Sequence, residues 1–398
     1  MFRSSGFAKP LDFIRSTSDL NITNKIKFYI LVVIALVAIA MFSTFFTTNK
    51  RFLLAATQVP TQSPTVTKAL HALYINSFGE NFGSIIWVGW RPRSGDIAIL
   101  YEQDTSIRIL DANTGKLKLV IQPPTVIGGI TSIGWSPDGK YLACSIVTSP
   151  NAIYIWDLSL NVLKDPLVLH HIGQQASFSW FPNSHQLVSV GAFGQYQGQW
   201  KLFVWDITQN KPITELEASD NPIVKVFVSP DGKTLAAFTR NGEGYSDLQL
   251  RDTTNFKIVK MLQKSPIGGE TTFISGEVSW SSDGTKLVGT LCAPITGACY
   301  VWVWNITDDQ VSQPTLTNQQ VDASNITPFI SSALSPDGNS LATNTASGAI
   351  FIWDIITDKL VSYVDESKSS VTSFSWSPDS TMLAISKSDG SVGIWKVH

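Results

Sequence analysis

The residue types that most often catalyse reactions or bind metals are few in this chain, and they are not spaced as in known catalytic motifs. Its five histidines form no H-E-x-x-H pair, its three cysteines include no C-x-x-C, and no G-x-S-x-G nucleophile turn is present. The adjacent His170 and His171 would need ligands from distant segments to hold a metal, so we interpret them as part of a polar loop. Neither Gly-Gly pair is followed by the helix and lysine of a phosphate-binding loop. We therefore expect no enzyme activity, no cofactor and no metal site.

Two cysteines have a spacing that suggests a disulfide. Cys292 and Cys299 flank the segment APITGA, between the apolar runs VGTLC and CYVWV. If these runs pair as a hairpin, the two sulfurs come close together. We predict a disulfide that forms only where the domain faces an oxidising compartment, with two free thiols in a loop as the alternative. Cys144, in YLACSIV, is expected to be a small buried apolar residue.

Composition indicates a folded chain with a sizeable core. Of 398 residues, 43% are hydrophobic and only 15% are charged, and the formal net charge is −2. Without a basic excess or a nucleic-acid-binding motif, the chain is not expected to bind nucleic acid.

The N-terminal region predicts a single membrane anchor. Residues 28–46 contain no charged side chain and would form a helix about 28 Å long, close to the thickness of a bilayer core. We therefore divide this region into a cytoplasmic segment (1–27), a transmembrane helix (28–48) and a linker (49–68). Residues 1–27 hold five basic side chains, which favours a cytoplasmic N-terminus and an extracytoplasmic C-terminal domain. A cleaved signal peptide and a cytoplasmic C-terminal domain are the alternatives.

From residue 84 onward, one turn-forming segment occurs seven times. In each copy an aromatic or apolar residue precedes a turn of the Ser-Pro-Asp-Gly type, and an apolar strand follows. Proline presets φ at the second turn position, and Asp and Gly suit the next two, so each turn should join two antiparallel strands. The seven copies lie 45, 45, 48, 52, 54 and 42 residues apart and begin at Trp90, Trp135, Trp180, Val228, Trp280, Leu334 and Trp376.

A second segment, an alternating strand that ends in Trp-Asp or a related pair, follows each turn. Alternation indicates a strand with one face packed against a neighbouring sheet. The final Asp is expected to bind backbone amides of the next turn, so we assign these aspartates to turn structure rather than catalysis. One sheet of about four strands cannot bury both faces alone, whereas seven packed radially can. The seven segments are IRILD, IYIWD, LFVWD, LQLRD, VWVWN, IFIWD and VGIWK.

These two signatures, in register over seven units, resemble the WD-repeat family. The resemblance implies an all-β fold, a seven-bladed WD-repeat β-propeller over residues 69–398, which usually serves as a binding platform. It also implies that residues 69–78 complete the last blade as its outer strand. The Gly-His dipeptide of the family is missing, so its buried Asp-His-Ser-Trp hydrogen-bond network should be mostly absent. Asp389 and Trp395 could supply two of its members in the last blade.

The connections between the second and third strands of a blade should open on one face of such a propeller. Two of them, residues 192–200 and 239–247, are long and lie in adjacent blades. They contain residue types that are enriched at binding hot spots, although these side chains could instead pack on their own loops. The candidate binding residues are Phe193, Tyr196, Trp200, Arg240 and Tyr245.

The function we expect is a non-catalytic, membrane-tethered scaffold for protein partners. Two alternatives stay open. One is an extracytoplasmic propeller enzyme, either a hydrolase or a quinoprotein-like dehydrogenase. The segment at residues 110–116 (LDANTGK) resembles the repeat of quinoprotein propellers, although it occurs a single time in this chain. The other is a ligand sensor whose anchor passes a signal inward.

Overall fold

The structure of the chain is a computed structural model. It describes residues 70–71, 73–79, 83–103, 106–123, 129–146, 152–159, 163–170, 177–193, 199–217, 223–240, 246–263, 273–274, 278–292, 299–307, 329–345, 348–357, 359–365 and 370–397. The chain divides into two units, Met1–Pro64 and Thr65–His398, and all described residues belong to the second. The predicted transmembrane helix at 28–48 and the flanking segments 1–27 and 49–68 therefore lie outside the described residues. Within the described residues, no helix is long and apolar enough to cross a membrane.

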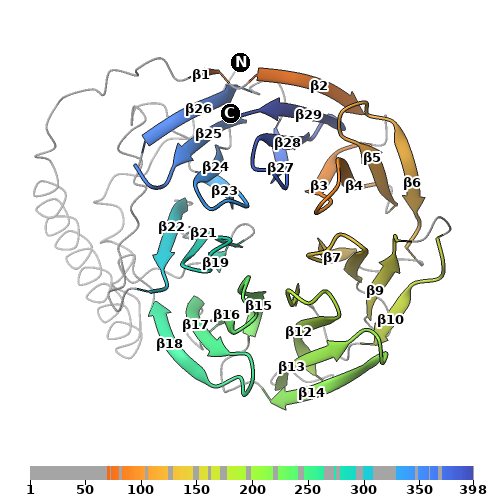
Figure 1. Cartoon of the computed structure of the whole chain (residues 1–398), viewed down its shortest axis with the longest axis vertical. Helices are drawn as coiled ribbons and strands as arrows, with labels where there is room; N and C mark the ends of the chain where they lie inside the picture. Colours follow the sequence, from red (N-terminus) through yellow and green to blue (C-terminus); the bar gives the residue numbers. More distant parts are fainter. Residues whose placement is uncertain are drawn as a thin grey trace, which may run out of the picture. The chain divides into compact units, whose positions relative to one another are not determined.

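Seven sheets, antiparallel except for one short parallel pair, are arranged around a common centre (Figure 1), which confirms the predicted seven-bladed β-propeller. We number the blades in chain order. The inner strands are β3 (Ile85–Trp90), β7 (Ile130–Trp135), β11 (Ser177–Trp180), β15 (Ile223–Val228), β19 and β20 (Phe273–Ile274, Ser279–Trp280), β23 (Phe329–Leu334) and β27 (Val371–Trp376). The second strands are β4 (Asp96–Tyr101), β8 (Tyr141–Ile146), β12 (Gln186–Phe193), β16 (Thr234–Arg240), β21 (Lys286–Cys292), β24 (Ser340–Thr345) and β28 (Met382–Lys387).

The third strands are the Trp-Asp-type segments of the sequence. They are β5 (Ile107–Asp111), β9 (Ala152–Asp157), β13 (Gln199–Asp206), β17 (Ser246–Asp252), β22 (Cys299–Asn305), β25 (Ala349–Asp354) and β29 (Ser391–Lys396). The outer strands are β6 (Leu117–Ile121), β10 (Leu167–His170), β14 (Lys211–Glu217), β18 (Ile258–Gln263), β26 (Lys359–Asp365) and β2 (Leu73–Gly79). The described residues supply no outer strand for the fifth blade.

The N-terminal strands close the ring. β2 pairs antiparallel with β29 through six residue pairs, from Leu73 with Lys396 to Gly79 with Ser391. This pairing confirms the expected outer strand of the seventh blade. The prediction that residues 69–78 form that outer strand is wrong for Leu70 and His71, which form the separate strand β1 (Leu70–His71). β1 pairs in parallel with β26 and gives the sixth blade a fifth strand. The segment from residue 70 to residue 79 therefore bridges two blades (Figure 1).

The Ser-Pro-Asp-Gly turns are held by hydrogen bonds from their own side chains. The Ser136 hydroxyl donates to Asp138 (2.7 Å) and accepts from the amide of Tyr141 (2.9 Å), while Asp138 accepts from the amide of Lys140 (3.0 Å). Four other blades repeat this arrangement. Gly139 has φ of 73°, and a Cβ there would lie 2.3 Å from the carbonyl oxygen of Pro92 in the preceding blade. Glycine is therefore required at this turn both by conformation and by close packing.

Serine replaces that glycine in the third and seventh blades. Ser184 and Ser380 adopt φ of 60° and 62°, a region that costs energy for a residue with a side chain. Their hydroxyls accept hydrogen bonds from the amides of Asp138 (3.1 Å) and Asp337 (3.0 Å). Each strained serine thus bonds to the preceding blade.

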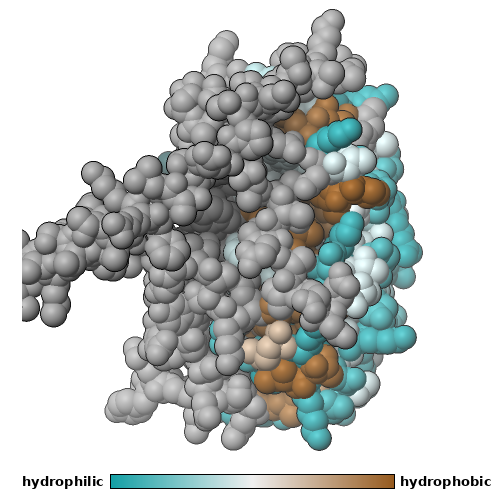
Figure 2. All heavy atoms as spheres, turned by 90° about the vertical axis from the view of Figure 1, so that its left-hand side faces the viewer, coloured by the Kyte–Doolittle hydropathy of each residue, from teal (hydrophilic) through white to brown (hydrophobic). Residues whose placement is uncertain are grey.

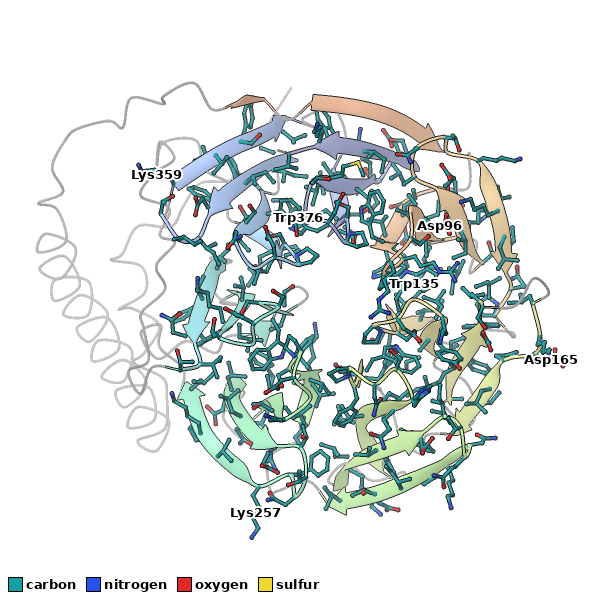
Figure 3. All side chains as sticks on the ribbon, in the orientation of Figure 1. Asp96, Trp135, Asp165, Lys257, Lys359 and Trp376 are labelled. Carbon is teal, nitrogen blue, oxygen red and sulfur yellow. The ribbon has the colours of Figure 1, made fainter. Side chains whose placement is uncertain are left out.

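Tryptophans at the ends of inner strands also join neighbouring blades. The indole N–H of Trp135 donates to the carbonyl of Gly89 (3.2 Å), and that of Trp376 donates to the carbonyl of Ala333 (3.0 Å). Trp180 and Trp280 make equivalent bonds. Figure 3 shows Trp135 and Trp376 toward the centre of the ring. Because each bond crosses between blades, these tryptophans fix the position of one sheet against the next.

Part of the WD-repeat hydrogen-bond network is present. The indole N–H of Trp205 donates to Ser189 (2.8 Å) and that of Trp353 donates to Thr343 (3.0 Å), although no histidine takes part in either bond. Asp389 accepts hydrogen bonds from the amide (2.9 Å) and hydroxyl (2.6 Å) of Ser391. The aspartates after the tryptophans bind turn amides as predicted, for example Asp157 with Ser159 (2.9 Å).

Candidate functional site

In the part of the chain that the structure describes, an extra residue interrupts the start of the inner strand in five blades. In the first blade Ile85 pairs with Tyr101 and Trp87 pairs with Leu100, so Ile86 has no opposite residue. Such β-bulges change the direction of a side chain and are common beside functional sites. All five lie at the end of the inner strand opposite the Ser-Pro-Asp-Gly turn. The bulge residues are Ile86, Thr131, Val224, Ile330 and Thr372.

A cavity of about 650 Å³ lies at this end of the inner strands, and we call it the channel pocket. Its volume is within the range of about 300–1,000 Å³ that is typical of ligand sites. Strands of the first four blades and Val278 of the fifth line it, and most of the side chains are apolar or aromatic. They include Ile86, Trp87, Phe178, Val224, Phe227 and Val278.

The polar side chains of the channel pocket are three hydroxyl residues and one lysine. Thr131 donates to the hydroxyl of Ser145 (3.2 Å), and the hydroxyl of Ser177 accepts from the amide of Val226 (3.4 Å). Among the described lining residues, Lys225 is the one with a charge, and none is a carboxylate. The pocket therefore combines an apolar surface with a positive charge from β15.

Three of the five binding residues predicted from the sequence, Phe193, Trp200 and Arg240, belong to strands at the same end of the propeller, and the connections are shorter than expected. Phe193 is the last residue of β12, opposite Gln199, and Trp200 belongs to β13. Arg240 is the last residue of β16, opposite Ser246. The connections therefore span only residues 194–198 and 241–245, because the hairpin pairing continues further than the polar residues and glycines suggested.

No described contact tests the binding role of these five residues. Tyr196 and Tyr245 lie outside the described residues, and only the backbone of Phe193, Trp200 and Arg240 is described. The backbone positions of Phe193, Trp200 and Arg240 in the propeller are nevertheless defined by the strand pairing. Thr239 pairs with Ile223 at the start of β15, so Arg240 follows directly at the bulged end of that inner strand.

The predicted hairpin between the two spaced cysteines is confirmed. β21 and β22 pair antiparallel, and Cys292 lies directly opposite Cys299. The disulfide itself stays a prediction. Cys144 is buried, as expected, and burial raises the pKa of its thiol.

A charged cluster joins the first two blades at the opposite end of the inner strands. The Arg91 guanidinium donates to the carbonyls of Gly139 (2.8 Å) and Leu158 (3.1 Å) and lies 5.5 Å from the ring of Trp135. Lys118 forms an ion pair with Asp111 (2.9 Å), and the hydrogen bond from Lys118 lowers the pKa of Asp111 to about 2. These contacts are made between neighbouring strands and blades, which indicates a structural role.

The channel pocket was not predicted from the sequence, although one signal was present. Alternation breaks at the start of the inner strands, where Ile85-Ile86 and Ile223-Val224 place two apolar residues together. The first is buried and the second is the bulge residue. Among the described residues, no three His, Cys, Asp or Glu side chains are grouped to hold a metal ion.

Comparison with known proteins agrees with the propeller fold. Residues 124–157 and 359–396 match the family model "WD domain, G-beta repeat". The chain is 24% identical to autophagy-related protein 16 of Arabidopsis thaliana over 69% of this chain and 48% of that protein. It is 26% identical to WD repeat-containing protein AAC3 of Dictyostelium discoideum over 50% of this chain and 38% of that protein.

A shorter match, 30% identical over 23% of this chain and 19% of the relative, is to cell division cycle 20.1, cofactor of APC complex, of A. thaliana. The chain thus spans about half or less of the length of these relatives. The seven sheets and these matches agree on a seven-bladed propeller with segments similar to the WD repeat, and propellers of that kind typically serve as scaffolds for protein interactions.

Proposed function

We propose that the chain is a non-catalytic scaffold that binds protein partners at the channel-pocket end of its propeller and is held at a membrane by residues 28–48. The proposal rests chiefly on the channel pocket, a cavity in which apolar and aromatic side chains from several blades are accessible to a partner. Partially exposed aromatic and aliphatic residues in a pocket are the usual anchors of protein interfaces. Phe193 and Arg240 end strands at the same end of the ring, Trp200 is the second residue of β13 there, and all three would extend this surface.

The names of the relatives support a regulatory role rather than an enzymatic one. One relative is described as autophagy-related and another as a cofactor of a complex. The membrane anchor is supported by the uncharged residues 28–46, and the extracytoplasmic position of the propeller by the basic residues that precede them.

A pull-down from detergent extracts with the full chain tests the binding role. Ile86 is 43% exposed at the mouth of the channel pocket, so Ile86→Asp should leave the core intact and place a carboxylate where a partner packs. We expect partner recovery to fall at least about tenfold, because desolvating that carboxylate costs more than a factor of ten in affinity.

Val259→Asp is the matched control. Val259 is 62% exposed on the outer strand β18, away from the channel pocket. Figure 2 views the ring from its outer side, where patches of hydrophobic residues lie between hydrophilic ones. This control should keep all partners. An Ile86→Asp protein that melts like the wild type and retains every partner would refute the proposed site.

A further inference from the structure

The groove between the first and second blades, at the Ser-Pro-Asp-Gly end of the ring, is filled by a side chain of the protein itself. Arg91 follows Trp90 in the first turn segment, and its guanidinium donates to the carbonyls of Gly139 (2.8 Å) and Leu158 (3.1 Å) in the second blade. Lys118, on the outer strand β6, lines the same groove, where a cavity of about 180 Å³ remains. This groove shows that a pair of carbonyls beside a blade interface can bind a guanidinium.

The equivalent groove between the third and fourth blades has apolar residues at both of these positions. Phe181 stands in the third turn segment where Arg91 stands in the first. Ile213 and Lys118 are each the bulge residue of an outer strand, β14 and β6, so Ile213 takes the place of Lys118. A cavity of about 460 Å³ lies between these two blades, near Lys257 in Figure 3, and we call it the interblade groove. Its volume is within the range of about 300–1,000 Å³ that is typical of ligand sites.

The fourth blade keeps the two carbonyls that bind a guanidinium in the first groove. Gly232 takes the place of Gly139, as the glycine of its Ser-Pro-Asp-Gly turn, and Thr253 takes the place of Leu158, after the third strand. Both Gly232 and Thr253 line the interblade groove. The Gly232 carbonyl accepts from the Thr253 hydroxyl (2.6 Å), which leaves its second lone pair for another donor. In the part of the chain that the structure describes, no donor reaches the carbonyl of Thr253.

A carboxylate adds negative charge to the interblade groove. Asp231 lines the groove, and its Oδ1 accepts from the hydroxyl of Ser229 (2.6 Å) and from the amide of Lys233 (3.0 Å). The hydrogen bond from Ser229 lowers the pKa of Asp231, as does the charge of Lys233, so the carboxylate is ionised at neutral pH. Both hydrogen bonds among the described residues use Oδ1, which leaves Oδ2 for a cationic ligand.

An aromatic ring lines the interblade groove from a strained backbone position. Phe256 adopts φ of 57°, which is unfavourable for a bulky residue, whereas Gly115 and Asn210 occupy this turn position in the first and third blades. The Phe256 ring is 7% exposed and belongs to the same apolar cluster as Phe181 and Val204. Because a guanidinium stacks on aromatic rings and has an apolar stem, this wall suits an arginine side chain.

We propose that the interblade groove binds an arginine side chain of a protein partner, whose guanidinium donates to the carbonyls of Gly232 and Thr253 and pairs with Asp231. The partner's arginine takes the place that Arg91 fills in the first groove. The planar guanidinium can reach two carbonyls at once, whereas the ammonium of a lysine is a point charge. The interblade groove lies at the opposite end of the inner strands from the channel pocket, so this inference goes beyond the proposed function.

Three matched tripeptides test the chemistry by isothermal titration calorimetry on the full chain in a nonionic detergent. They are acetylated and amidated, with glycine before and leucine after a central arginine, citrulline or lysine. The arginine peptide should bind with a Kd at least about tenfold lower than the citrulline peptide, because charge-assisted hydrogen bonds are roughly twice as strong as neutral ones. The lysine peptide should bind more weakly than the arginine peptide. An arginine peptide that binds no more tightly than either of the others would overturn the inference.

Two pairs of variants locate the bound arginine. Ile213 is 43% exposed, so Ile213→Lys should fold and should raise the Kd of the arginine peptide at least about fivefold by like-charge repulsion. Val259→Lys is the matched control, because Val259 is the bulge residue of β18 in the next blade and is 62% exposed. Asp231→Asn should also weaken binding, whereas Asp379→Asn, in the matching turn of the seventh blade, should not. Equal effects within either pair would mean that the arginine binds elsewhere.

The channel-pocket variant and the pull-down separate this inference from the proposed function. Ile86→Asp should bind the arginine peptide as the wild type does, and loss of that binding would place the arginine in the channel pocket and overturn the inference. In the pull-down, excess arginine peptide should release a protein that Ile213→Lys fails to recover and Val259→Lys retains. A peptide that binds but releases no protein would overturn the protein ligand. If no peptide binds but Ile86→Asp still loses its partners, the proposed function stands and this inference fails.

Discussion

Stepwise truncation measures how much the N-terminal strands stabilise the ring. Removing residues 1–68 leaves β1 and β2 in place, removing 1–72 deletes β1, and removing 1–80 deletes both. β2 forms six residue pairs with β29, and β1 forms two with β26. We count about one backbone hydrogen bond for each residue pair and about 0.5–1.5 kcal/mol of net stability for each hydrogen bond. Loss of β2 should then lower the free energy of unfolding by about 3–9 kcal/mol, and loss of β1 by about 1–3 kcal/mol.

The free energy lost with β2 approaches the whole free energy of unfolding of a typical domain, which is about 5–15 kcal/mol. The protein without residues 1–80 should therefore be largely unfolded, or should melt far below the other two. Urea unfolding followed by tryptophan fluorescence gives the three free energies of unfolding. If removal of 1–80 and removal of 1–68 give equal midpoints and slopes, β2 does not close the ring and the reasoning fails.

Three further predictions concern the cysteines, the membrane and acid. Opposite residues of an antiparallel pair have Cα atoms about 4.5–5.5 Å apart, within the range of a disulfide. Mass spectrometry of the unreduced protein should therefore show Cys292 bonded to Cys299 if the propeller faces an oxidising compartment, and alkylation of both thiols there would exclude the bond. Protease added to intact cells should remove the propeller if residues 28–48 span the membrane with the N-terminus inside, and protection until lysis would mean the reverse orientation. The hydrogen bond from the hydroxyl of Ser281 lowers the pKa of Asp283 to about 2 from 3.8, so its stabilisation is present above about pH 4 and is lost as the pH falls toward about 2. Thermal melts of wild type and Asp283→Asn should converge over that interval, and a constant difference down to pH 2 would contradict the assignment.

The repeating turns were predictable because their causes are local. Pro, Asp and Gly set the turn conformation within four residues, and the serine before them bonds to the same turn. The alternating strands follow from side-chain periodicity in the same way. Seven copies of these signals were therefore enough to indicate seven sheets, whereas the outer strand of the last blade was implied by the resemblance to WD-repeat proteins.

The features that were missed depend on contacts between distant segments. β1 has two residues, and its pairing with β26 is determined by where the ring brings the N-terminal segment. The channel pocket is lined by bulge residues of different blades, such as Ile86 and Val224, which line one cavity only in the closed ring. The polar residues and glycines near Phe193 and Arg240 predict loops, but in the structure the strand pairing continues through residues that favour turns.

Site-specific photo-crosslinking tests most directly whether the propeller binds proteins at its channel pocket. A benzoylphenylalanine at position 86 lies at the pocket mouth, and one at position 259 lies on the outer strand β18. On irradiation of intact cells, position 86 should yield adducts with the proteins that the wild type recovers in the pull-down, and position 259 should not. Adducts with those proteins at position 259 and none at position 86 would contradict the account.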